Sequence, residues 1–179
     1  MVAQLKWSHH ESARHERITP SASLAELQLV WSQLDRDSCP QSYNFHMHTV
    51  HSDGRLTPDA LVWQVCDIGL KGFAITDHHS VNGYLQARHL IPANGPQIWS
   101  GVEITAALLG DEVHILGYGF DPHHAALAPY LSGDRAPESD FPAEKTIAAL
   151  HAAGGLAVLA HPFRYRLSAE ALVAAAASA

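Results

Sequence analysis

The sequence contains few cysteines, no long apolar run and no excess of basic residues. Its two cysteines, Cys39 and Cys66, are too few for a disulfide framework and too far apart for a paired thiolate metal site. No apolar run approaches the roughly 20 residues that cross a bilayer, and the start of the chain lacks the apolar core of a signal peptide. We therefore expect a soluble, cytoplasmic protein with no membrane segment.

Positive charge is also scarce. The formal net charge is −7, and the 11 lysines and arginines form no basic stripe. Non-specific binding of a long nucleic acid depends on a positive surface, so we expect no such partner, although a single nucleotide is not excluded. With 179 residues, 47% of them hydrophobic, the chain can build the core of one domain.

Histidine is the abundant exception, because the 14 histidines outnumber all lysines and arginines. Residues 1–22 are polar and aperiodic, so we expect a flexible tail whose histidines take no part in function. Residues 23–41 are predicted to form a leading helix and linker, since Ser23 and Glu26 make a capping box. Residues 42–179 are predicted to form the functional domain.

Within this domain, apolar strand patterns alternate with helical ones. Strands are predicted at 42–49, 72–77, 97–103, 113–119 and 156–160, and helices at 58–68, 80–90, 142–153 and 168–179. The stretch from 121 to 140 is predicted to be a long surface connection. Strands that alternate with helices favour a parallel sheet, and the pattern does not decide between an open sheet and a closed barrel.

The strongest chemical signal is the segment FHMHTVHSDG, which runs from Phe45 to Gly54. Residues two apart on a strand point to the same side, so His46 and His48 present two imidazoles to one point. Asp53, after a turn, can add a carboxylate there. Imidazoles and a carboxylate favour Zn, Mn, Fe or Co, and the sequence therefore predicts a metal site at this strand end.

The next predicted strand ends in Asp77-His78-His79. Parallel α/β folds place their ligands at such carboxyl ends, so His78 is predicted to bind metal. Asp77 either orients the ring of a metal-bound histidine or caps the strand end. The role of His79 is left open.

Two more strand ends carry similar side chains. Glu103 ends an apolar strand, and its two oxygens could bridge two ions. His114 lies within an apolar run, where a metal ligand and a satisfied core histidine are equally good interpretations. His161 ends the last strand, and Arg164 or Arg166 could hold a phosphate group, with a surface salt bridge as the alternative for either one.

Taken in order, the motifs HMHTVHSDG, ITDHHS, GVEI, EVHILGY and LAHPFRYR resemble those of the polymerase-and-histidinol-phosphatase (PHP) superfamily, and are most similar to its small stand-alone phosphoesterases. The resemblance implies a distorted seven-stranded (β/α) TIM-like barrel with two or three divalent ions, commonly Mn, Zn or Fe. It implies hydrolysis of a small phosphoester, for example a nucleotide or histidinol phosphate, with Glu103, His78 and Asp53 acting in catalysis. The metal ligands that it implies are His46, His48, Asp53, His78, Glu103, His114 and His161.

The sequence departs from the family pattern at three places. Asn44 and His79 stand where acidic residues are frequent in the family, and no Asp-x-His motif follows Arg166. The resemblance therefore predicts a chain truncated at its C-terminus, with an incomplete barrel. Unpaired strand edges in such a barrel would favour a homo-oligomer.

Two other interpretations remain open. The chain could be a non-catalytic metal-binding or interaction module that keeps the ligands without a complete active site. It could instead be an amidohydrolase, a class that also starts a barrel with His-x-His. That class needs a lysine at a later strand end, and Lys71 and Lys145 fall in predicted helix or loop positions.

Overall fold

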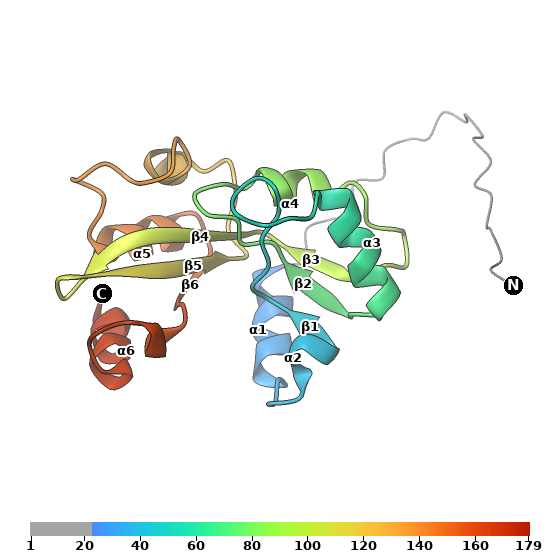
Figure 1. Cartoon of the computed structure of the whole chain (residues 1–179), viewed down its shortest axis with the longest axis horizontal. Coiled ribbons are helices and arrows are strands. Elements are labelled where there is room, and N and C mark those ends of the chain that lie inside the picture. The colour runs from blue at the N-terminus through green and yellow to red at the C-terminus, as the bar shows by residue number, and fades with distance from the viewer. Residues whose placement is uncertain (1–22) are drawn as a thin grey trace, which may run out of the picture.

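The computed structural model describes residues 23–179 and shows a mixed α/β fold built on two small sheets (Figure 1). The predicted tail, 1–22, lies outside the described residues. The strands are β1 (Tyr43–Asn44), β2 (Gly72–Ala74), β3 (Gln97–Trp99), β4 (Gly101–Leu108), β5 (Asp111–Tyr118) and β6 (Leu156–Leu159). The helices are α1 (Leu24–Ser32), α2 (Ser38–Gln41), α3 (Pro58–Ile68), α4 (Asn82–Ala87), α5 (Ala143–Ala152) and α6 (Ala169–Ser178), with 3-10 turns η1 (Ala125–Tyr130) and η2 (Pro162–Arg164).

Helix ends follow the local signals in the sequence. The capping box of α1 is present, because Ser23 Oγ accepts from Glu26 N and Glu26 Oε2 accepts from Ser23 N. Helix α3 begins at Pro58, and the glycine that follows its last residue, Gly69, ends it by adopting φ +81°. The expected cap of α4 is wrong, since that helix begins two residues after Ser80.

The first sheet has the order β1-β2-β3 and is parallel throughout, as predicted. Helices α3 and α4 cover it with a shared core, in which Leu61 and Val65 of α3 and Tyr84 of α4 meet Phe73 and Ile98 of the strands. Burial of these side chains, each worth about 1.5–3 kcal/mol, holds the helices on the sheet.

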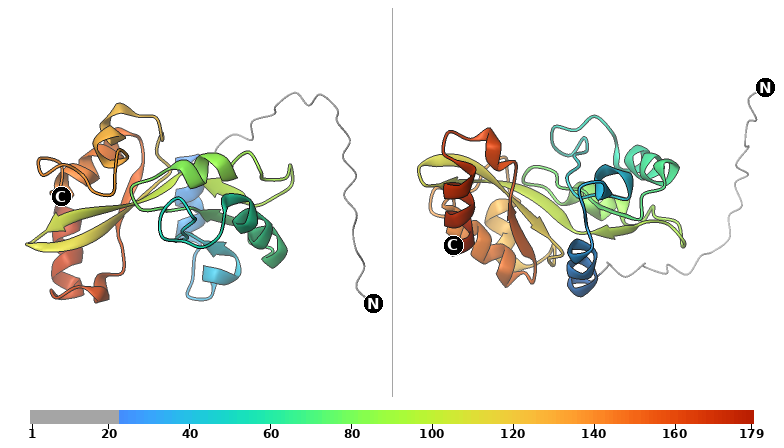
Figure 2. Two further views of the ribbon diagram at one scale, coloured as in Figure 1. Left: turned by 45° about the horizontal axis from the view of Figure 1, so that its top comes forward. Right: turned by 90° about the horizontal axis from the view of Figure 1, so that it is seen from below.

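The second sheet has the order β4-β5-β6 and is antiparallel, which corrects the prediction of a single parallel sheet. Strand β4 continues to Leu108 and turns directly into β5 through Leu109 and Gly110, both at positive φ. A two-residue turn of this kind can join only antiparallel strands, whereas parallel ones need a long crossover. The β4–β5 hairpin extends away from the first sheet (Figures 1 and 2).

The two faces of this second sheet differ in chemistry. Val102, Ile104, Val113 and Ile115 belong to an apolar core that also includes Leu150 of α5. The alternate residues face the other way, where α1 packs with Leu27 against Leu116, Tyr118 and Trp99. Glu103 lies on this second face, since side chains alternate along a strand.

Backbone hydrogen bonds join the two sheets at one seam. Glu103 N donates to Asp77 O and His79 N donates to Glu103 O, whereas Thr76 N donates to Met47 O within the first sheet. The chain beyond β2 therefore runs beside the start of β4. A closed barrel is not observed: the described sheets have three strands each and do not close on themselves.

None of the helices within residues 23–179 combines the length and the apolar character that spanning a bilayer requires.

Candidate metal centre

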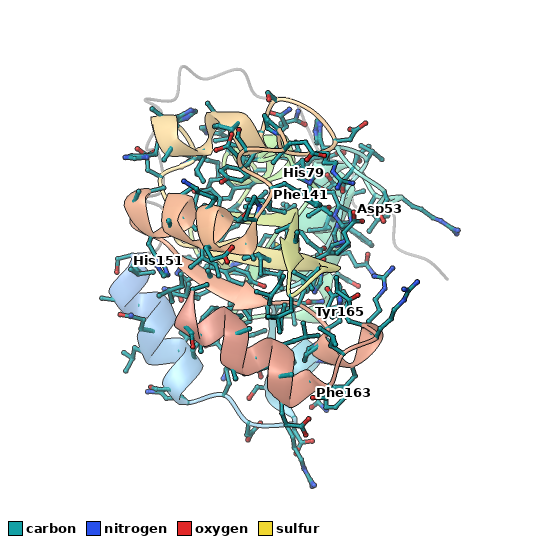
Figure 3. All side chains as sticks on the ribbon, turned by 90° about the vertical axis from the view of Figure 1, so that its left-hand side faces the viewer. Asp53, His79, Phe141, His151, Phe163 and Tyr165 are labelled. Atoms are coloured by element: carbon teal, nitrogen blue, oxygen red, sulfur yellow. The ribbon has the colours of Figure 1, made fainter. Side chains whose placement is uncertain are left out.

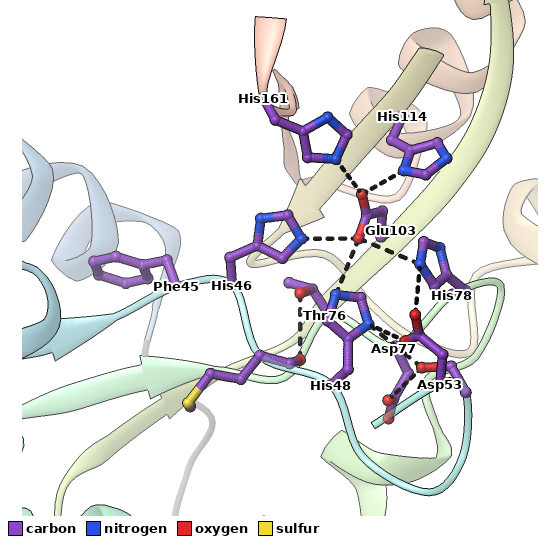
Figure 4. A network of polar contacts seen from close by, with 12 residues as sticks. Phe45, His46, His48, Asp53, Thr76, Asp77, His78, Glu103, His114 and His161 are labelled. Atoms are coloured by element: carbon purple, nitrogen blue, oxygen red, sulfur yellow. Dashed lines mark hydrogen bonds and ion pairs between the residues drawn. The ribbon is translucent and has the colours of Figure 1, made fainter. Parts of the chain in front are cut away.

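The centre lies at the seam between the sheets, around the side chain of Glu103. This side chain is 1% exposed, and a charged group is buried in a protein only where partners compensate for its lost hydration. Five imidazoles surround it (Figure 4) and belong to His46, His48, His78, His114 and His161.

Adjacent strands deliver these side chains to one place. His46 and His48 follow β1 in an extended segment, so both rings point to the same side, as predicted. His78 forms an isolated parallel bridge with Glu103. On β5, His114 stands opposite Thr105. Of the two interpretations left open for His114, the structure disfavours the satisfied core histidine, because the ring contacts the Glu103 carboxylate.

The last strand brings in the fifth ring. Ala160 N donates to His114 O, which continues the ladder beyond β6, and His161 follows at φ +31°. A positive φ is unusual for a residue other than glycine, and the sharp turn that it makes leads directly into η2. The structure thus brings together, around Glu103, histidines from three predicted strand ends and His114 from within β5.

The two oxygens of Glu103 face separate groups of rings. The first, Oε2, lies 2.8 Å from Nε2 of His46, 3.1 Å from Nε2 of His48 and 3.8 Å from Nε2 of His78. The second, Oε1, lies 2.7 Å from Nδ1 of His114 and 3.1 Å from Nε2 of His161. This division is what a carboxylate bridging two cations requires, as each oxygen has its own nitrogen partners.

The five rings also contact one another in a closed circle. Centroid separations run from 4.8 Å between His48 and His78 to 5.9 Å between His46 and His161. The remaining neighbours in the circle are 5.1–5.2 Å apart. Only the His46–His161 pair is stacked, while the other neighbouring rings are tilted or meet edge to face, so the rings surround the carboxylate at different angles.

Asp53 lies at the open side of this circle. Its Oδ1 is 3.3 Å from Nδ1 of His48 and its Oδ2 is 3.8 Å from Nε2 of His78, and the side chain is 71% exposed. The turn that carries Asp53 lies so close to the preceding segment that a Cβ at position 54 would collide with the backbone of His48, so glycine is required there. The sequence prediction that this carboxylate folds back toward the histidines agrees with the geometry.

The pKa values show how strongly the groups interact. Burial alone would raise the pKa of the Glu103 carboxyl, but hydrogen bonds from the histidines, that of His114 foremost, hold it far below its ordinary value. Burial lowers the pKa of His48, yet the hydrogen bond and charge of Glu103 outweigh burial and raise it overall. For His78 and His161 burial dominates and the pKa is lowered, which favours the neutral imidazole.

The donor set fits divalent transition metals. Groups of three donors whose ligand atoms lie within 4.8 Å of one another are His46-His48-Glu103, His48-Asp53-His78 and His78-Glu103-His114. Neutral imidazole nitrogens and carboxylate oxygens suit Zn, Mn and Fe. The lowered pKa values of His78 and His161 agree with this chemistry, because a ring nitrogen binds metal only when it carries no proton.

Asp77 has a different role from the ring-orienting one considered from sequence. Its carboxylate accepts hydrogen bonds from Thr49 N at 2.6 Å, Thr49 Oγ1 at 2.7 Å and Ser52 Oγ at 2.8 Å. The side chain is fully buried and holds the turn that leads to Asp53. Ser52 Oγ in turn lies 3.4 Å from Nδ1 of His48, so the same turn supports a ring of the centre.

His79, left open by the sequence, is a structural side chain. Its Nδ1 lies 2.9 Å from the carbonyl oxygen of Tyr130, and its Nε2 accepts from Thr105 N at 3.1 Å. Both ring nitrogens are thereby occupied away from Glu103. Burial lowers the pKa of His79, consistent with a neutral ring that donates to one group and accepts from the other.

The two arginines lie at the β4–β5 turn rather than around Glu103. Arg164 and Arg166 line a hollow of about 370 Å³ with Tyr165 and the β4–β5 turn, where Asp111 and Glu112 also contribute. Phe163, two residues after His161, is 91% exposed. In Figure 3, Phe163, Tyr165 and Asp53 are found along one side of the molecule. The lysines considered for an amidohydrolase lie elsewhere, Lys71 before β2 and Lys145 in α5.

Sequence reasoning missed Tyr165, whose hydroxyl contacts both His114 and His161. The signal was its place four residues after His161, immediately beyond a proline turn that folds the chain back. It also missed Thr49 and Ser52 as partners of Asp77, because these contacts connect segments 25–28 residues apart.

Comparison with known proteins agrees with this arrangement. The family model of the PHP domain matches residues 44–161. The 5′-3′ exoribonuclease Rnm of Escherichia coli (strain K12) is 36% identical over 92 residues, which are 50% of this chain and 31% of the relative. The 3′,5′-nucleoside bisphosphate phosphatase of Chromobacterium violaceum is 33% identical over 92 residues, 51% of this chain and 32% of the relative. The chain thus spans about a third of the length of these curated relatives.

Solved structures show the same fold. An amidohydrolase from Chromobacterium violaceum superposes with a TM-score of 0.66 at 20% identity, over 76% of this chain and 74% of the other. A protein from Bifidobacterium adolescentis, provisionally assigned as a metal-dependent phosphoesterase, gives a TM-score of 0.64 at 25% identity, over 77% of this chain and 74% of the other.

Proposed function

The chain belongs to the PHP domain family, and on that premise we propose that it hydrolyses a small phosphoester, with water as the nucleophile. The observation that carries the proposal is the divided contact of Glu103, whose two oxygens each face their own imidazoles. A buried carboxylate with that environment is suited to bridge cations, and curated relatives in the family are named as a phosphatase and a diphosphodiesterase.

We propose that two or three divalent ions, Mn, Zn or Fe, are held by the seven residues of the centre. When bound, such ions lower the pKa of a coordinated water and neutralise charge on a phosphoryl group. The proposed ligands are His46, His48, Asp53, His78, Glu103, His114 and His161.

In this proposal, the role of each side chain follows from its exposure to solvent. Glu103 is buried and fixes the histidines by accepting from them, so its role is to hold the centre together. Asp53 and His78 lie on the open side, where a substrate can arrive. Asp53, the most exposed, can accept a hydrogen bond from an attacking water and so orient it. Asp53 and His78 are the proposed catalytic contacts, and Glu103, which the family resemblance groups with them, supports them from the buried side.

We propose a substrate of the nucleotide type. Phe163 exposes its ring to solvent two residues from His161, and no core packing explains an apolar side chain that is 91% exposed. An exposed aromatic face beside a phosphate site suits stacking against a base, worth about 1–3 kcal/mol. Arg164 and Arg166, which line the hollow at the β4–β5 turn, are the proposed partners of a phosphate oxygen.

Phosphate release from an aryl phosphate and from a nucleoside 3′,5′-bisphosphate, together with metal analysis of the purified chain, tests the proposal. We expect release with both substrates, abolished in His48→Ala and retained in His89→Ala, a matched change at an exposed histidine outside the centre. Phe163→Ala should raise the KM for the nucleotide about tenfold and leave that for the aryl phosphate within a factor of two. Equal effects on both substrates would contradict a base-stacking role.

A non-catalytic metal-binding module is the second candidate, and the observation that favours it is that Asp111 and Glu112 share the hollow of Arg164 and Arg166, where their negative charge opposes an anionic substrate. Metal bound in stoichiometric amount without release from either substrate would support it against hydrolysis.

A further inference from the structure

The hydroxyl of Tyr165 stands between two histidines of the centre. It lies 2.8 Å from the backbone nitrogen of His114 and 3.0 Å from Nδ1 of His161. The rings of Tyr165 and His161 are also packed together, with centroids 5.5 Å apart. One hydroxyl therefore connects a strand of the second sheet with the turn that follows β6.

The donors and acceptors leave few arrangements for these atoms. A backbone N–H can only donate, so the Tyr165 oxygen accepts from His114. The hydroxyl then keeps one proton and one lone pair. In the metal-free protein Nε2 of His161 faces the Glu103 carboxylate, which can only accept, so Nε2 carries the proton and Nδ1 accepts from the hydroxyl. A metal at Nε2 would require the proton on Nδ1, which would then donate to the Tyr165 oxygen. In both cases Nδ1 is occupied, and Nε2 is the nitrogen that faces Glu103, at 3.1 Å.

We propose that Tyr165 is a positioning residue that commits Nε2 of His161 to the metal centre by occupying Nδ1. The inference rests on the proposed metal centre. It adds to that centre Tyr165, a residue that lies in the LAHPFRYR motif but has been given no role by it. Metal-bound histidines generally use their second nitrogen in a hydrogen bond that fixes the ring, and Tyr165 supplies that bond here.

Two observations argue that His161 needs such an anchor. His114 presents its Nδ1 to Glu103, at 2.7 Å, whereas His161 presents Nε2, so the choice of nitrogen is set by local contacts and not by residue type. His161 also sits at φ +31°, a backbone conformation that non-glycine residues adopt at a cost and that surrounding contacts must hold.

Zinc binding and histidine spectroscopy on the full chain test the inference. The Tyr165→Phe variant keeps the ring and removes the hydroxyl. Tyr84→Phe is the matched control, because Tyr84 is buried in α4 against the first sheet. Competition between the protein and a chelator for Zn²⁺ gives the affinity, and long-range 1H–15N correlation of labelled histidine reports which ring nitrogen of His161 carries the proton or the metal.

We expect Tyr165→Phe to weaken zinc binding by about 10- to 100-fold and Tyr84→Phe to change it by less than twofold. In the metal-free protein, the His161 ring nitrogens should shift from one dominant tautomer to a mixture in Tyr165→Phe alone. Unchanged zinc affinity and unchanged His161 signals would overturn the inference and leave Tyr165 as a cap on the His114 N–H.

If Tyr165→Phe unfolds at the working temperature, 3-fluorotyrosine placed at position 165 keeps the hydroxyl and alters its donor strength. A shift of the His161 ring nitrogens then supports the contact, and no shift overturns it. Neither measurement uses phosphate release. A chain that binds zinc in a Tyr165-dependent way without turnover would therefore retain this inference while the proposed hydrolysis fails.

Discussion

At the scale of single residues, Glu103 is the group on which the centre depends. Replacing it with glutamine keeps the shape and removes the charge, so Glu103→Gln should lower metal affinity by more than about 100-fold, beyond the loss typical of an outer hydrogen-bond partner. Phosphate release should fall with it, while the metal-free variant still unfolds cooperatively. Metal analysis, phosphate assay and a thermal melt check this together, and release within tenfold of wild type would contradict the role given to Glu103.

Asp77 allows a graded test of the turn before Asp53. Asp77→Ala leaves buried Thr49 donors without an acceptor, which should cost about 2–4 kcal/mol of unfolding free energy. Asp77→Asn keeps one acceptor oxygen for Thr49 N and Ser52 Oγ, so it should cost less than half as much. Urea unfolding of both variants measures the difference. Equal losses would mean that Asp77 acts through its charge rather than through its hydrogen bonds.

Single residues of the centre could be predicted where spacing carried the information. His46 and His48 followed from the two-residue period of a strand. Glu103 was predicted at the end of a strand 97–103, whereas it lies near the start of β4, which runs to Leu108. Asp77 could not be assigned, since its partners lie 25 to 28 residues away along the chain, and for Tyr165 only the contact with His161 is local, while its contact with His114 spans 51 residues. Contacts of that length depend on how strands pair, which no local pattern specifies.

At the scale of elements, helices were predicted well and strand pairing was not. Capping residues and glycines determine where α1, α3 and α6 begin or end, and those signals lie within a few residues of the boundary. The antiparallel pairing of β4 with β5 depends instead on the turn at Leu109 and Gly110, which no familiar turn pair such as Asn-Gly announces. The prediction of one parallel sheet was wrong for this reason.

Packing of α5 on the second sheet gives a test at this scale. A Cβ at Gly117 of β5 would collide with the side chain of Leu150, which is fully buried. Gly117→Ala should therefore cost about 1–3 kcal/mol of stability, while Gly133→Ala, at a loop glycine with open space around it, should stay within about 0.5 kcal/mol. Chemical denaturation compares them.

The double variant Gly117→Ala with Leu150→Val identifies the cause, since a smaller partner should recover part of the loss. Full additivity of the two changes would mean that Gly117 matters for its backbone rather than for the space that it leaves.

At the scale of the whole molecule, the centre joins segments from His46 to His161 and both sheets at once. Binding of metal by the folded state alone must then stabilise the fold, by about 2.7 kcal/mol at 100 times the dissociation constant. For a chain of this size that corresponds to a rise in Tm of roughly 2–4 °C per kcal/mol. Differential scanning calorimetry with and without chelator should show the rise in wild type and not in Glu103→Gln.

The barrel predicted from the family resemblance is the part of the fold that the described residues do not display. Two sheets of three strands, one parallel and one antiparallel, meet at the seam without closing. A sequence motif identifies the side chains with a chemical role and the segments that carry them. It says little about how the strands that precede those segments pair with one another.

The turn at Leu109 and Gly110 is exposed and far along the hairpin from Glu103, a location where added or lost residues are ordinarily tolerated. Here its length decides which way β5 faces. One residue more or fewer would shift the register of β5 by one residue, so that its side chains exchange faces of the sheet. The His114 ring would then enter the apolar layer under α5, and Ile115 would face the carboxylate. A change in length at this distant tip would therefore disable the centre while every residue in it stays the same.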